Sequence, residues 1–455
     1  MRRPVWVLHV FVVGLALHNF VMAELWAAGV RGNTLQVISA WKEALLLFAL
    51  VLVLRARGSL RFTPTLVDWL ALAFGAVVVV YALIPQHVLD GNATHHGVLL
   101  ATRDYLVPVG AYFLGRGLAL RTGELRALGR TIVATAAGLA AFGLIDVYAI
   151  PLSWWRRSGV PNWYLHQLGF NYGTGLSHLP QNFVYNAGDG NVYRRLVSTF
   201  LSPLATSYVL VIALLVCAAW WVSRRPKGRA LAAWLGSVVL IFAGLLWTHS
   251  RASYLALALG LVVFALVRGT TRDRVALVAA AVATVAIGAV FVDGYTHFGP
   301  KTSFTAAELK EQIQHAHQPG AGTAGNGFND ASTASHWQSL RDGVRTVVHH
   351  PQGFGPGNAS STAVRTGVPI KAGESTYTQL GADLGLIGAL VFVAWALTLT
   401  WRSLFCVAWV GASLVAMLAL GLQTDLIGVP WLAYVLFALA GTSQPDLWRG
   451  RRPAS

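Results

Sequence analysis

Glu374, Arg251 and the pair Arg194-Arg195 are the residues whose types and surroundings suit chemistry. Glu374 stands where a long polar segment meets an apolar run. A carboxylate that is partly shielded from water has a raised pKa, and a neighbouring arginine holds it ionised. That combination suits a general base that removes the proton of a hydroxyl group. The structural alternative is a first-turn carboxylate that stabilises the N-terminus of a helix.

The arginines stand at the edges of apolar runs. Arg251 lies in WTHSRASYLAL, and Arg194-Arg195 lie in YRRLVSTFLSP. Arginine is permanently charged, and its planar guanidinium group matches the oxygen atoms of a phosphate. Two such sites at the ends of membrane spans predict a receptor for a lipid-linked phosphate or diphosphate. Anchoring of these arginines to lipid headgroups is the alternative.

Four further residues are second-rank candidates. His336, Arg341 and His349 lie in HWQSLRDGVRTVVHHPQGFGPGN, and Tyr377 follows Glu374. The chain has 14 histidines, but no cysteine or carboxylate spacing around them supports a metal site, and both cysteines lie in apolar runs. The sequence therefore predicts neither a metal nor another cofactor, with solvated histidines as the default.

The composition is that of a membrane protein. Of 455 residues, 55% are hydrophobic and only 11% are charged, with a mean hydropathy of +0.56. A soluble domain carries roughly a quarter charged residues. The formal charge of +16 invites a nucleic-acid partner, but the arginines stand between apolar runs, which is typical of cytoplasmic loops. The predicted partner is therefore a lipid bilayer, not a nucleic acid.

The apolar runs predict an all-α integral membrane protein with about 12 transmembrane helices. The first run resembles a signal peptide, but the topology requires it as an uncleaved span. Most of the 34 lysines and arginines then lie in short loops on one side, which places both termini in the cytoplasm. The predicted spans are 5–27, 36–54, 65–84, 98–120, 128–149, 200–222, 230–247, 251–267, 275–292, 377–400, 403–422 and 428–444.

This topology divides the chain into five parts. Residues 1–149 form membrane helices 1–5, and 150–199 form an extracytoplasmic loop whose aromatic residues are expected at the membrane interface. Residues 200–292 form helices 6–9. Residues 293–376 form a large extracytoplasmic loop, and 377–455 form helices 10–12 and a basic cytoplasmic tail.

The large loop has internal structure of its own. We expect the Gly/Ala/Ser-rich tract 318–335 to be mobile. Apolar residues then recur at spacings of three and four over 336–350, which predicts a helix with one apolar face. Pro351 ends that helix, and GFGPGN predicts a tight turn that depends on its glycines.

Several charged residues fall inside predicted spans, where each needs a partner or a purpose. Lys42-Glu43 and Arg103-Asp104 are expected to neutralise one another and to pack polar groups between helices. Asp68 and Asp146 lie near predicted membrane boundaries, where a solvated carboxylate costs little. We therefore interpret both as structural.

Four segments together resemble the O-antigen ligase and polymerase superfamily of bacterial envelope glycan assembly. They are RRLVSTFLSP, LLWTHSRASYLALALG, HWQSLRDGVRTVVHHPQGFGPGN and ESTYTQLGADLGLIGAL, and they cover roughly residues 194–395. The resemblance implies a metal-independent glycosyltransferase of the cytoplasmic (inner) membrane, with its active site on the extracytoplasmic side. Such an enzyme joins a glycan from an undecaprenyl-diphosphate carrier to a hydroxyl of a glycan or glycolipid acceptor. Arg194 or Arg195, together with Arg251, would hold the donor diphosphate.

The chain departs from the ligases at one position. Where the ligases carry a histidine-asparagine pair, this chain has Glu374-Ser375. The departure favours a polymerase, or a divergent ligase, with glutamate as the base, and it leaves open an inactive homologue. Two other classes remain as alternatives: a transporter or flippase of a lipid-linked glycan, and a peptidoglycan polymerase of the shape, elongation, division and sporulation type. A transporter predicts repeated halves and broken helices.

Overall fold

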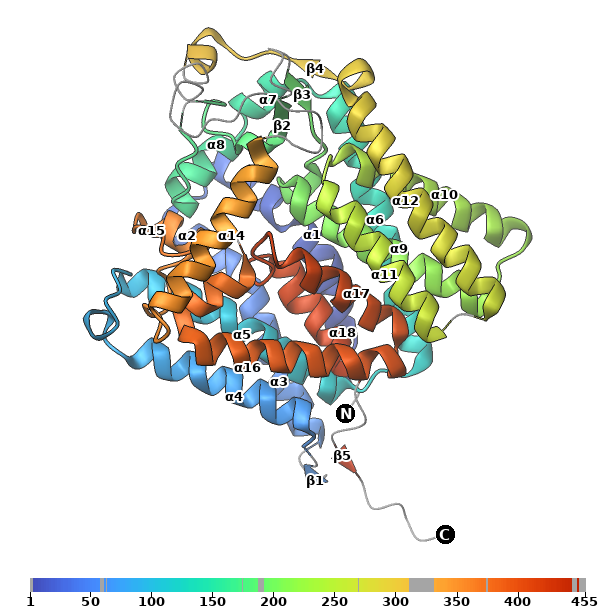
Figure 1. Cartoon of the computed structure of the whole chain (residues 1–455), viewed down its shortest axis with the longest axis horizontal. Helices are drawn as coiled ribbons and strands as arrows, with labels where there is room; N and C mark the ends of the chain where they lie inside the picture. Colours follow the sequence, from blue (N-terminus) through green and yellow to red (C-terminus); the bar gives the residue numbers. More distant parts are fainter. Residues whose placement is uncertain are drawn as a thin grey trace.

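The computed structural model describes residues 3–57, 61–62, 64–173, 175–186, 192–268, 270–310, 331–373, 375–443 and 448–449. It is 78% helical, which fits the predicted all-α membrane protein (Figure 1). Glu374 and most of the tract 318–335 lie outside the described residues. The backbone of 331–335 belongs to a helix.

The helices follow one another with short connections, apart from two long loop regions. Their bounds are α1 (Trp6–Ala27), α2 (Gly32–Ser39), α3 (Trp41–Arg57), α4 (Leu66–Leu83), η1 (Gln86–Val88), α5 (His95–Leu118), α6 (Thr122–Ala149), α7 (Leu152–Arg157), α8 (Val160–Asn162), η2 (Trp163–Leu168), η3 (Gln181–Phe183), η4 (Ser198–Phe200), α9 (Pro203–Arg224), α10 (Gly228–Trp247), α11 (Arg251–Arg268), α12 (Thr271–Phe298), α14 (Ala331–His349), α15 (Ser360–Thr366), α16 (Thr376–Cys406), α17 (Ala408–Leu420), η5 (Leu432–Leu436) and α18 (Phe437–Thr442).

Within the described residues, nine helices are long and apolar enough to cross a membrane. They are α1, α2 with α3, α4, α6, α9, α10, α11, α12 and α16. The other three predicted spans coincide with α5, with the 13-residue α17 and with the short helical segment η5–α18. Helix α5 falls outside the nine, and it carries Arg103, Asp104 and Arg116 within its length. These charged residues form ion pairs: Arg103 with Asp104, and Arg116 with Asp68.

Five short strands join the loops. They are β1 (Arg61–Phe62), β2 (Val184–Asn186), β3 (Val192–Arg194), β4 (Lys301–Thr302) and β5 (Trp448–Arg449). Strands β2, β3 and β4 form one antiparallel sheet, and β1 pairs with β5.

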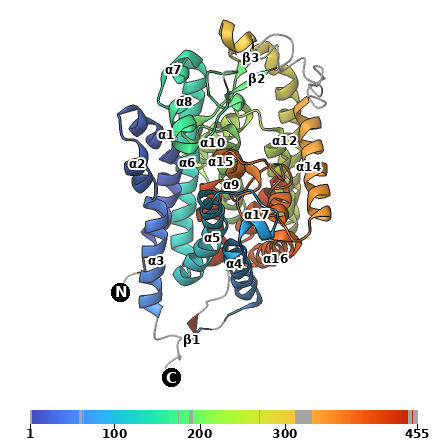
Figure 2. The ribbon, with the colours of Figure 1, turned by 90° about the vertical axis from the view of Figure 1, so that its left-hand side faces the viewer.

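The two predicted extracytoplasmic segments contact each other. The sheet β2–β3–β4 combines strands from both segments, and Arg156 forms a 2.6 Å ion pair with Glu308. Figure 1 shows α7, α8, α14 and α15 gathered on the same side of the molecule, away from both labelled termini. Figure 2 shows α1–α3 along one edge of the bundle and α14 at the opposite edge.

At the end of the bundle where both labelled termini lie (Figure 1), contacts join several of the arginine-containing loops that the sequence places on one face of the membrane. Arg3 donates to the carbonyl oxygens of Leu118 and Ala119, both at 2.8 Å, and pairs with Glu124. The connection after α3 reaches the C-terminal tail through the pairing of β1 with β5. These connections are therefore held together in space, as a shared membrane face requires.

Helix α1 is an integral part of the bundle. Its residues Val7, Phe11 and Val12 have no exposed surface. The indole Nε1 of Trp431, just before η5, donates a 3.0 Å hydrogen bond to the carbonyl oxygen of Val12. The first helix therefore packs against the last helical segment of the membrane region.

The expectation that Asp68 and Asp146 are solvated is wrong. Both side chains have no exposed surface. Asp68 forms a bidentate ion pair at 2.8 and 2.9 Å with Arg116, which lies in the last turn of α5. Asp146 accepts a 3.1 Å bond from Arg194. Each carboxylate is buried because a guanidinium group neutralises it.

Three aromatic residues of the first long loop are buried inside the protein. Trp155 has no exposed surface, Trp163 is 3% exposed and Tyr164 is 6% exposed. They form a second hydrophobic cluster with Met22 and Trp26 of α1. The rings are buried because the loop folds back onto the end of α1.

Helix α16 is broken near its start. Gly385 has φ +66° and ψ 176°, which separates a nine-residue first part from the rest of the helix. The loop after α14 occupies the break, since Leu386 N donates to the carbonyl oxygen of Pro351 at 2.8 Å. Positive φ angles at Gly353, Gly355 and Gly357 confirm the predicted turn in GFGPGN.

Candidate functional site

Arg195 and Arg251 meet where the first long loop crosses the turn before α11. Leu196 N donates to the carbonyl oxygen of Trp247 at 2.9 Å, which fixes this crossing. Arg195 Nε donates to the carbonyl oxygen of Thr248 at 3.0 Å, three residues before Arg251. The two arginines that the sequence singled out therefore stand side by side, although 55 residues of chain separate them.

The charge of Arg195 is not neutralised by its own hydrogen bonds. Within the described part of the chain, they go to the carbonyl oxygens of Thr248 and His249, which are uncharged acceptors. Burial, with a smaller contribution from the positive charge of Arg251, lowers the pKa of Arg195 to about 10, against the opposing effects of Tyr254 and Tyr295. Two half-buried cations that repel each other favour an anion between them.

Arg194 has a different role from its neighbour. It is 3% exposed, and it donates to Asp146 at 3.1 Å and to the carbonyl oxygen of Ile150 at 2.7 Å. Asp146 is fixed in turn by Trp155 Nε1 at 2.6 Å. Because its charge is paired inside the protein, Arg194 is poorly suited to hold a ligand. Of the two adjacent arginines, Arg195 is the better candidate.

The turn before α11 is under backbone strain. His249 has φ +52°, a backbone conformation that residues other than glycine rarely adopt. Its ring lies 4.2 Å from the ring of Tyr185 and 4.9 Å from that of Tyr295, measured between centroids. Strained residues of this kind gather at functional sites. Sequence reasoning missed His249, although it stands inside the WTHSRAS segment.

The start of α16 is docked on the loop 421–428. Thr376 Oγ1 donates to the carbonyl oxygen of Thr424 at 2.7 Å and accepts from Leu426 N at 2.8 Å. Ser375 Oγ donates to the carbonyl oxygen of Gly421 at 3.1 Å. These contacts fix the residues that immediately follow Glu374.

Tyr377 acts as an anchor for the same helix. Its hydroxyl donates to the carbonyl oxygen of Leu418, at the end of α17, at 2.7 Å. A side chain occupied in this way positions the helix and does not need a ligand. We therefore assign this second-rank candidate a positioning role.

A chain of polar contacts through α9 joins the two regions. Ser207 Oγ lies 2.8 Å from Ser253 Oγ, near the start of α11. The next residue, Tyr208, donates its hydroxyl to Thr424 Oγ1 at 2.8 Å. The carbonyl oxygen of Thr424 in turn accepts the hydrogen bond from Thr376 Oγ1. The start of α11 and the start of α16 are thus attached to adjacent positions of one buried helix.

Helix α14 covers the first part of α16. A Cβ atom on Gly343 would lie 2.8 Å from Thr378, and one on Gly381 would lie 2.6 Å from Val347, so small residues permit the close approach. Gly373, directly before Glu374, faces Ser339 in the same way. The three contacts follow the same direction along both segments, so Ser339 of α14 lies by Gly373, and Val347, nearer the other end of α14, lies by Gly381.

Only part of the apolar face predicted for 336–350 packs against the protein. Val347 faces Gly381 of α16, and the nearby Gly343 lets the two helices approach closely. Trp337 is 57% exposed, Val344 50% and Val348 68%. These three side chains of the predicted face therefore lie on the surface.

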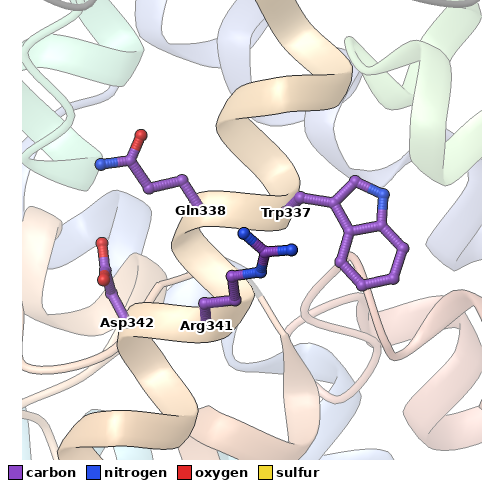
Figure 3. A pocket seen from close by; sticks show the side chains of 4 residues that line it. All are labelled: Trp337, Gln338, Arg341 and Asp342. Carbon is purple, nitrogen blue, oxygen red and sulfur yellow. The ribbon is translucent and has the colours of Figure 1, made fainter.

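Two second-rank candidates of α14 lie on its surface. Arg341 is exposed and lines a shallow hollow with Trp337, Gln338 and Asp342 (Figure 3). His349 is exposed, and its Nδ1 contacts the carbonyl oxygen of Arg345 in its own helix at 2.8 Å. Neither residue is brought to the paired arginines by any contact of the described residues.

Sequence reasoning also missed the group that holds the glycine turn. Asp383 has no exposed surface, and it accepts hydrogen bonds from Tyr105 at 2.6 Å and from the backbone N–H groups of Gly357 and Asn358 at 3.0 Å. The Asn358 side chain closes the turn by donating to the carbonyl oxygen of Phe354 at 2.9 Å. The signal was a lone aspartate in an apolar helix.

The long apolar helices of the described residues define an integral membrane protein. Its candidate site is the pair of guanidinium groups of Arg195 and Arg251. Residues 236–393 match the sequence model of a family described as O-Antigen ligase. The chain therefore carries a domain of the O-antigen ligase and polymerase superfamily, as the four sequence segments indicate. No curated protein matches the chain significantly.

The family match spans Arg251 and Glu374 but begins after Arg194 and Arg195. The family description points to a membrane glycosyltransferase of the ligase or polymerase type, which uses a lipid-linked glycan donor and a glycan acceptor. Among the described residues, no group of three His, Cys, Asp or Glu side chains is placed to hold a metal ion.

Proposed function

We propose that the protein transfers or polymerises a glycan from a polyprenyl-diphosphate carrier onto an acceptor hydroxyl, on the extracytoplasmic side of the cytoplasmic membrane. The observation that supports this most directly is the juxtaposition of Arg195 and Arg251 through the turn at Thr248. A diphosphate offers the negative charge that two adjacent guanidinium groups favour.

The proposed reaction is a displacement at the anomeric carbon of the donor glycan. Glu374 accepts the proton of the acceptor hydroxyl, and the hydroxyl oxygen bonds to the anomeric carbon. The bond between that carbon and the diphosphate oxygen breaks, and the diphosphate leaves with the bonding electrons on the carrier lipid. Arg195 and Arg251 stabilise the charge that develops on the departing oxygen.

The donor site is tested by measuring affinity for the polyprenyl-diphosphate-linked glycan of the producing cells, with purified protein in lipid nanodiscs. We expect Arg251→Ala and Arg195→Ala each to weaken binding about tenfold or more, since each removes charged hydrogen bonds. Arg272→Ala is the matched control, because Arg272 is an exposed arginine near the start of α12. Unchanged affinity in both site variants would show that the diphosphate binds elsewhere.

The break in α16 at Gly385 is the observation that favours a transporter, because broken helices are common at transport sites. Here the break in the helix leaves the backbone N–H of Leu386 without a helical partner, and this group donates a hydrogen bond to the carbonyl oxygen of Pro351. Movement of the lipid-linked glycan across a proteoliposome membrane without acceptor, with no glycosidic product when acceptor is supplied, would establish transport in place of transfer.

A further inference from the structure

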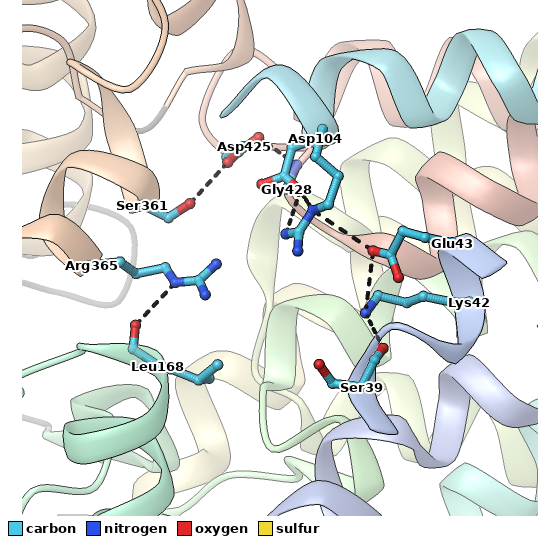
Figure 4. A network of polar contacts seen from close by, with 10 residues as sticks. Ser39, Lys42, Glu43, Asp104, Leu168, Ser361, Arg365, Asp425 and Gly428 are labelled. Atoms are coloured by element: carbon cyan, nitrogen blue, oxygen red, sulfur yellow. Dashed lines mark hydrogen bonds and ion pairs between the residues drawn. The ribbon is translucent and has the colours of Figure 1, made fainter. Parts of the chain in front are cut away.

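A second group of charged side chains lies apart from the paired arginines, around the first half of α5 (Figure 4). Four elements contribute to it: α3, α5, α15 and the loop 421–428. We call it the α5 cluster, and it consists of Lys42, Glu43, Arg103, Asp104, Arg365 and Asp425.

Two dipeptides form the centre of the α5 cluster. Arg103 pairs with Asp104 at 2.7 Å and approaches Glu43 at 3.7 Å, and Glu43 lies 3.5 Å from Lys42. The predicted pairing of Lys42-Glu43 with Arg103-Asp104 is thereby found as a single network. The side chain of Arg103 is nevertheless 38% exposed and that of Asp104 is 23% exposed, so a ligand can reach them.

Arg365 faces this network from α15. Its Nε donates to the carbonyl oxygen of Leu168 at 3.1 Å, and the described residues offer no hydrogen-bond partner to its two terminal nitrogens. Asp104 and Arg103 act on its charge from across the cluster. Figure 4 shows its guanidinium group extending from α15 toward the other members. Arg365 therefore has donors directed at an accessible polar space.

An aromatic surface adjoins Arg365. Its guanidinium carbon lies 5.8 Å from the centroid of the Phe170 ring, and that ring stacks on Tyr172 at 5.6 Å with an interplanar angle of 11°. Both rings are half-buried. A flat apolar surface beside converging polar groups is the usual composition of a small-molecule site.

Asp425 connects the α5 cluster to the mouth of α16. It accepts hydrogen bonds from Gly428 N at 2.8 Å and from Ser361 Oγ at 3.4 Å. The same loop 421–428 holds Thr376, two residues after Glu374. Gln379, one turn further along α16, is 4% exposed, and its Oε1 has no hydrogen-bond partner among the described residues. A ligand in the α5 cluster would thus border the loop that holds the start of α16, two residues after Glu374 in the chain.

The charge balance distinguishes the α5 cluster from the donor site. It has three cationic members, Lys42, Arg103 and Arg365, and three carboxylates, so no net charge attracts a diphosphate. Alternating donors and acceptors suit a ligand rich in hydroxyl groups, each of which both donates and accepts. A cavity of about 20 Å³ behind the centre of the cluster is large enough for one hydroxyl group or one water.

We propose that the α5 cluster, with the stacked rings of Phe170 and Tyr172, binds the acceptor glycan through its hydroxyl groups. The acceptor role rests on the function proposed above, because it requires a transfer reaction. The loop 421–428 then separates two sites: the paired arginines take the donor diphosphate, and the α5 cluster presents the acceptor hydroxyl to the base.

The test uses purified full-length protein in lipid nanodiscs and two probes from the producing cells. One is oligosaccharide released from the surface polysaccharide by mild acid, and the other is the polyprenyl-diphosphate-linked glycan. We expect Arg365→Ala and Asp104→Asn each to raise the Kd for the oligosaccharide about tenfold or more while the Kd for the lipid-linked glycan stays unchanged. Arg365→Gln replaces Arg365→Ala if that variant does not fold.

Two exposed residues of the same types, on other helices, serve as matched controls. Arg157→Ala removes an exposed arginine of α7, and Asp293→Asn neutralises an exposed aspartate of α12. Both controls should bind the two probes as the wild-type protein does. Loss of oligosaccharide binding in these controls, equal to that in the site variants, would mean a general effect of charge and would overturn the assignment.

The outcomes separate this proposal from the function on which it rests. Unchanged oligosaccharide affinity in both site variants overturns the acceptor site, even if Arg251→Ala loses the donor. Oligosaccharide binding that is lost in the site variants, in a protein that makes no glycosidic bond, supports a glycan-binding site but removes its acceptor role together with the proposed glycosyltransferase.

Discussion

The hydroxyl of Tyr208 lies 2.8 Å from Thr424 Oγ1, and this hydrogen bond joins α9 to the loop 421–428, two segments that the sequence gives no reason to connect. Tyr208 is next to Ser207, which contacts the start of α11, and Thr424 receives Thr376 at the start of α16. The placement of the start of α16 relative to the start of α11 therefore depends on α9.

Tyr208→Phe should lower the catalytic rate without changing donor affinity. The variant removes one buried hydrogen bond, worth about 1 kcal/mol, and so loosens the loop that supports α16. Rates of product formation and donor binding, measured on the same preparation, check this. Tyr164→Phe is the control, since Tyr164 makes a similar buried bond to the carbonyl oxygen of Leu201 in the first long loop. Equal rate losses in both variants would indicate general destabilisation.

Glu374→Gln should reduce product formation by about 10²- to 10⁴-fold, the usual contribution of a general base, with donor affinity retained. Glutamine keeps the shape of the side chain but cannot accept the proton. Single-turnover transfer and donor binding provide the two measurements. Glu124→Gln, at the opposite end of the bundle, should have no effect on either. Wild-type turnover in Glu374→Gln would remove the base assignment and favour a helix-capping role.

Asp68→Asn should destabilise the protein by about 3–5 kcal/mol, because it leaves Arg116 charged and unpaired in the bundle interior. Unfolding in detergent, followed by the loss of helical signal, measures the change. The double variant Asp68→Leu with Arg116→Met removes both charges and should recover much of that loss. A single variant as stable as the wild type would mean that water reaches the pair.

Acceptor binding should weaken as the pH falls from 7 to 5. Burial raises the pKa of Asp425 to about 6, and the negative charge of Asp104 contributes, while hydrogen bonds from Gly428, Ser361 and Gln379 oppose the shift. Protonation removes a carboxylate that accepts hydrogen bonds from sugar hydroxyls. The acceptor KM should therefore rise toward low pH, and Asp425→Asn should flatten this profile.

The same raised pKa has the opposite sign for folding. The stability contributed by Asp425 is fully present below its unfolded pKa and is lost as the pH rises through about 6, because ionisation is then unfavourable in the folded state. Weaker acceptor binding at pH 5 is therefore not explained by unfolding at this residue. An acceptor KM for the wild-type protein that does not change with pH would contradict the prediction.

Gly385→Ala should destabilise the protein by about 1–3 kcal/mol, since φ +66° is strained for alanine. An added Cβ would also lie 2.7 Å from the hydroxyl of Tyr81 and 2.8 Å from the carbonyl oxygen of Gln352. Thermal unfolding measures the effect. Gly138→Ala is the control, because a Cβ there meets nothing within 4 Å and Gly138 lies in the middle of α6. Equal stability of the two variants would show that the break is tolerant.

The helices were largely predictable from the sequence because a bilayer imposes one length and one composition on them. Each predicted span contains a helical segment, and the glycine turn follows from the spacing of Gly353, Gly355 and Gly357. The sequence predicted only that Arg195 and Arg251 lie on the same face of the membrane. The hydrogen bond from Arg195 to Thr248 shows that the two residues are neighbours on that face.

What the sequence could not supply is the pairing of charges over long separations. Arg194 and Arg195 are identical in type, yet one neutralises Asp146 and the other faces Arg251. No periodicity distinguishes them, since the direction of each side chain depends on the strand β3 and on helices far away in the chain. The α5 cluster was missed as a ligand site for the same reason, because Arg365 and Asp425 lie hundreds of residues from Lys42.

The hydrogen bond from Trp431 to Val12 has a consequence for the order of biosynthesis. Helix α1 completes this contact only when the segment that carries Trp431, 419 positions further along the chain, has been made. The packing of an early helix of the bundle therefore waits for a segment that is synthesised much later.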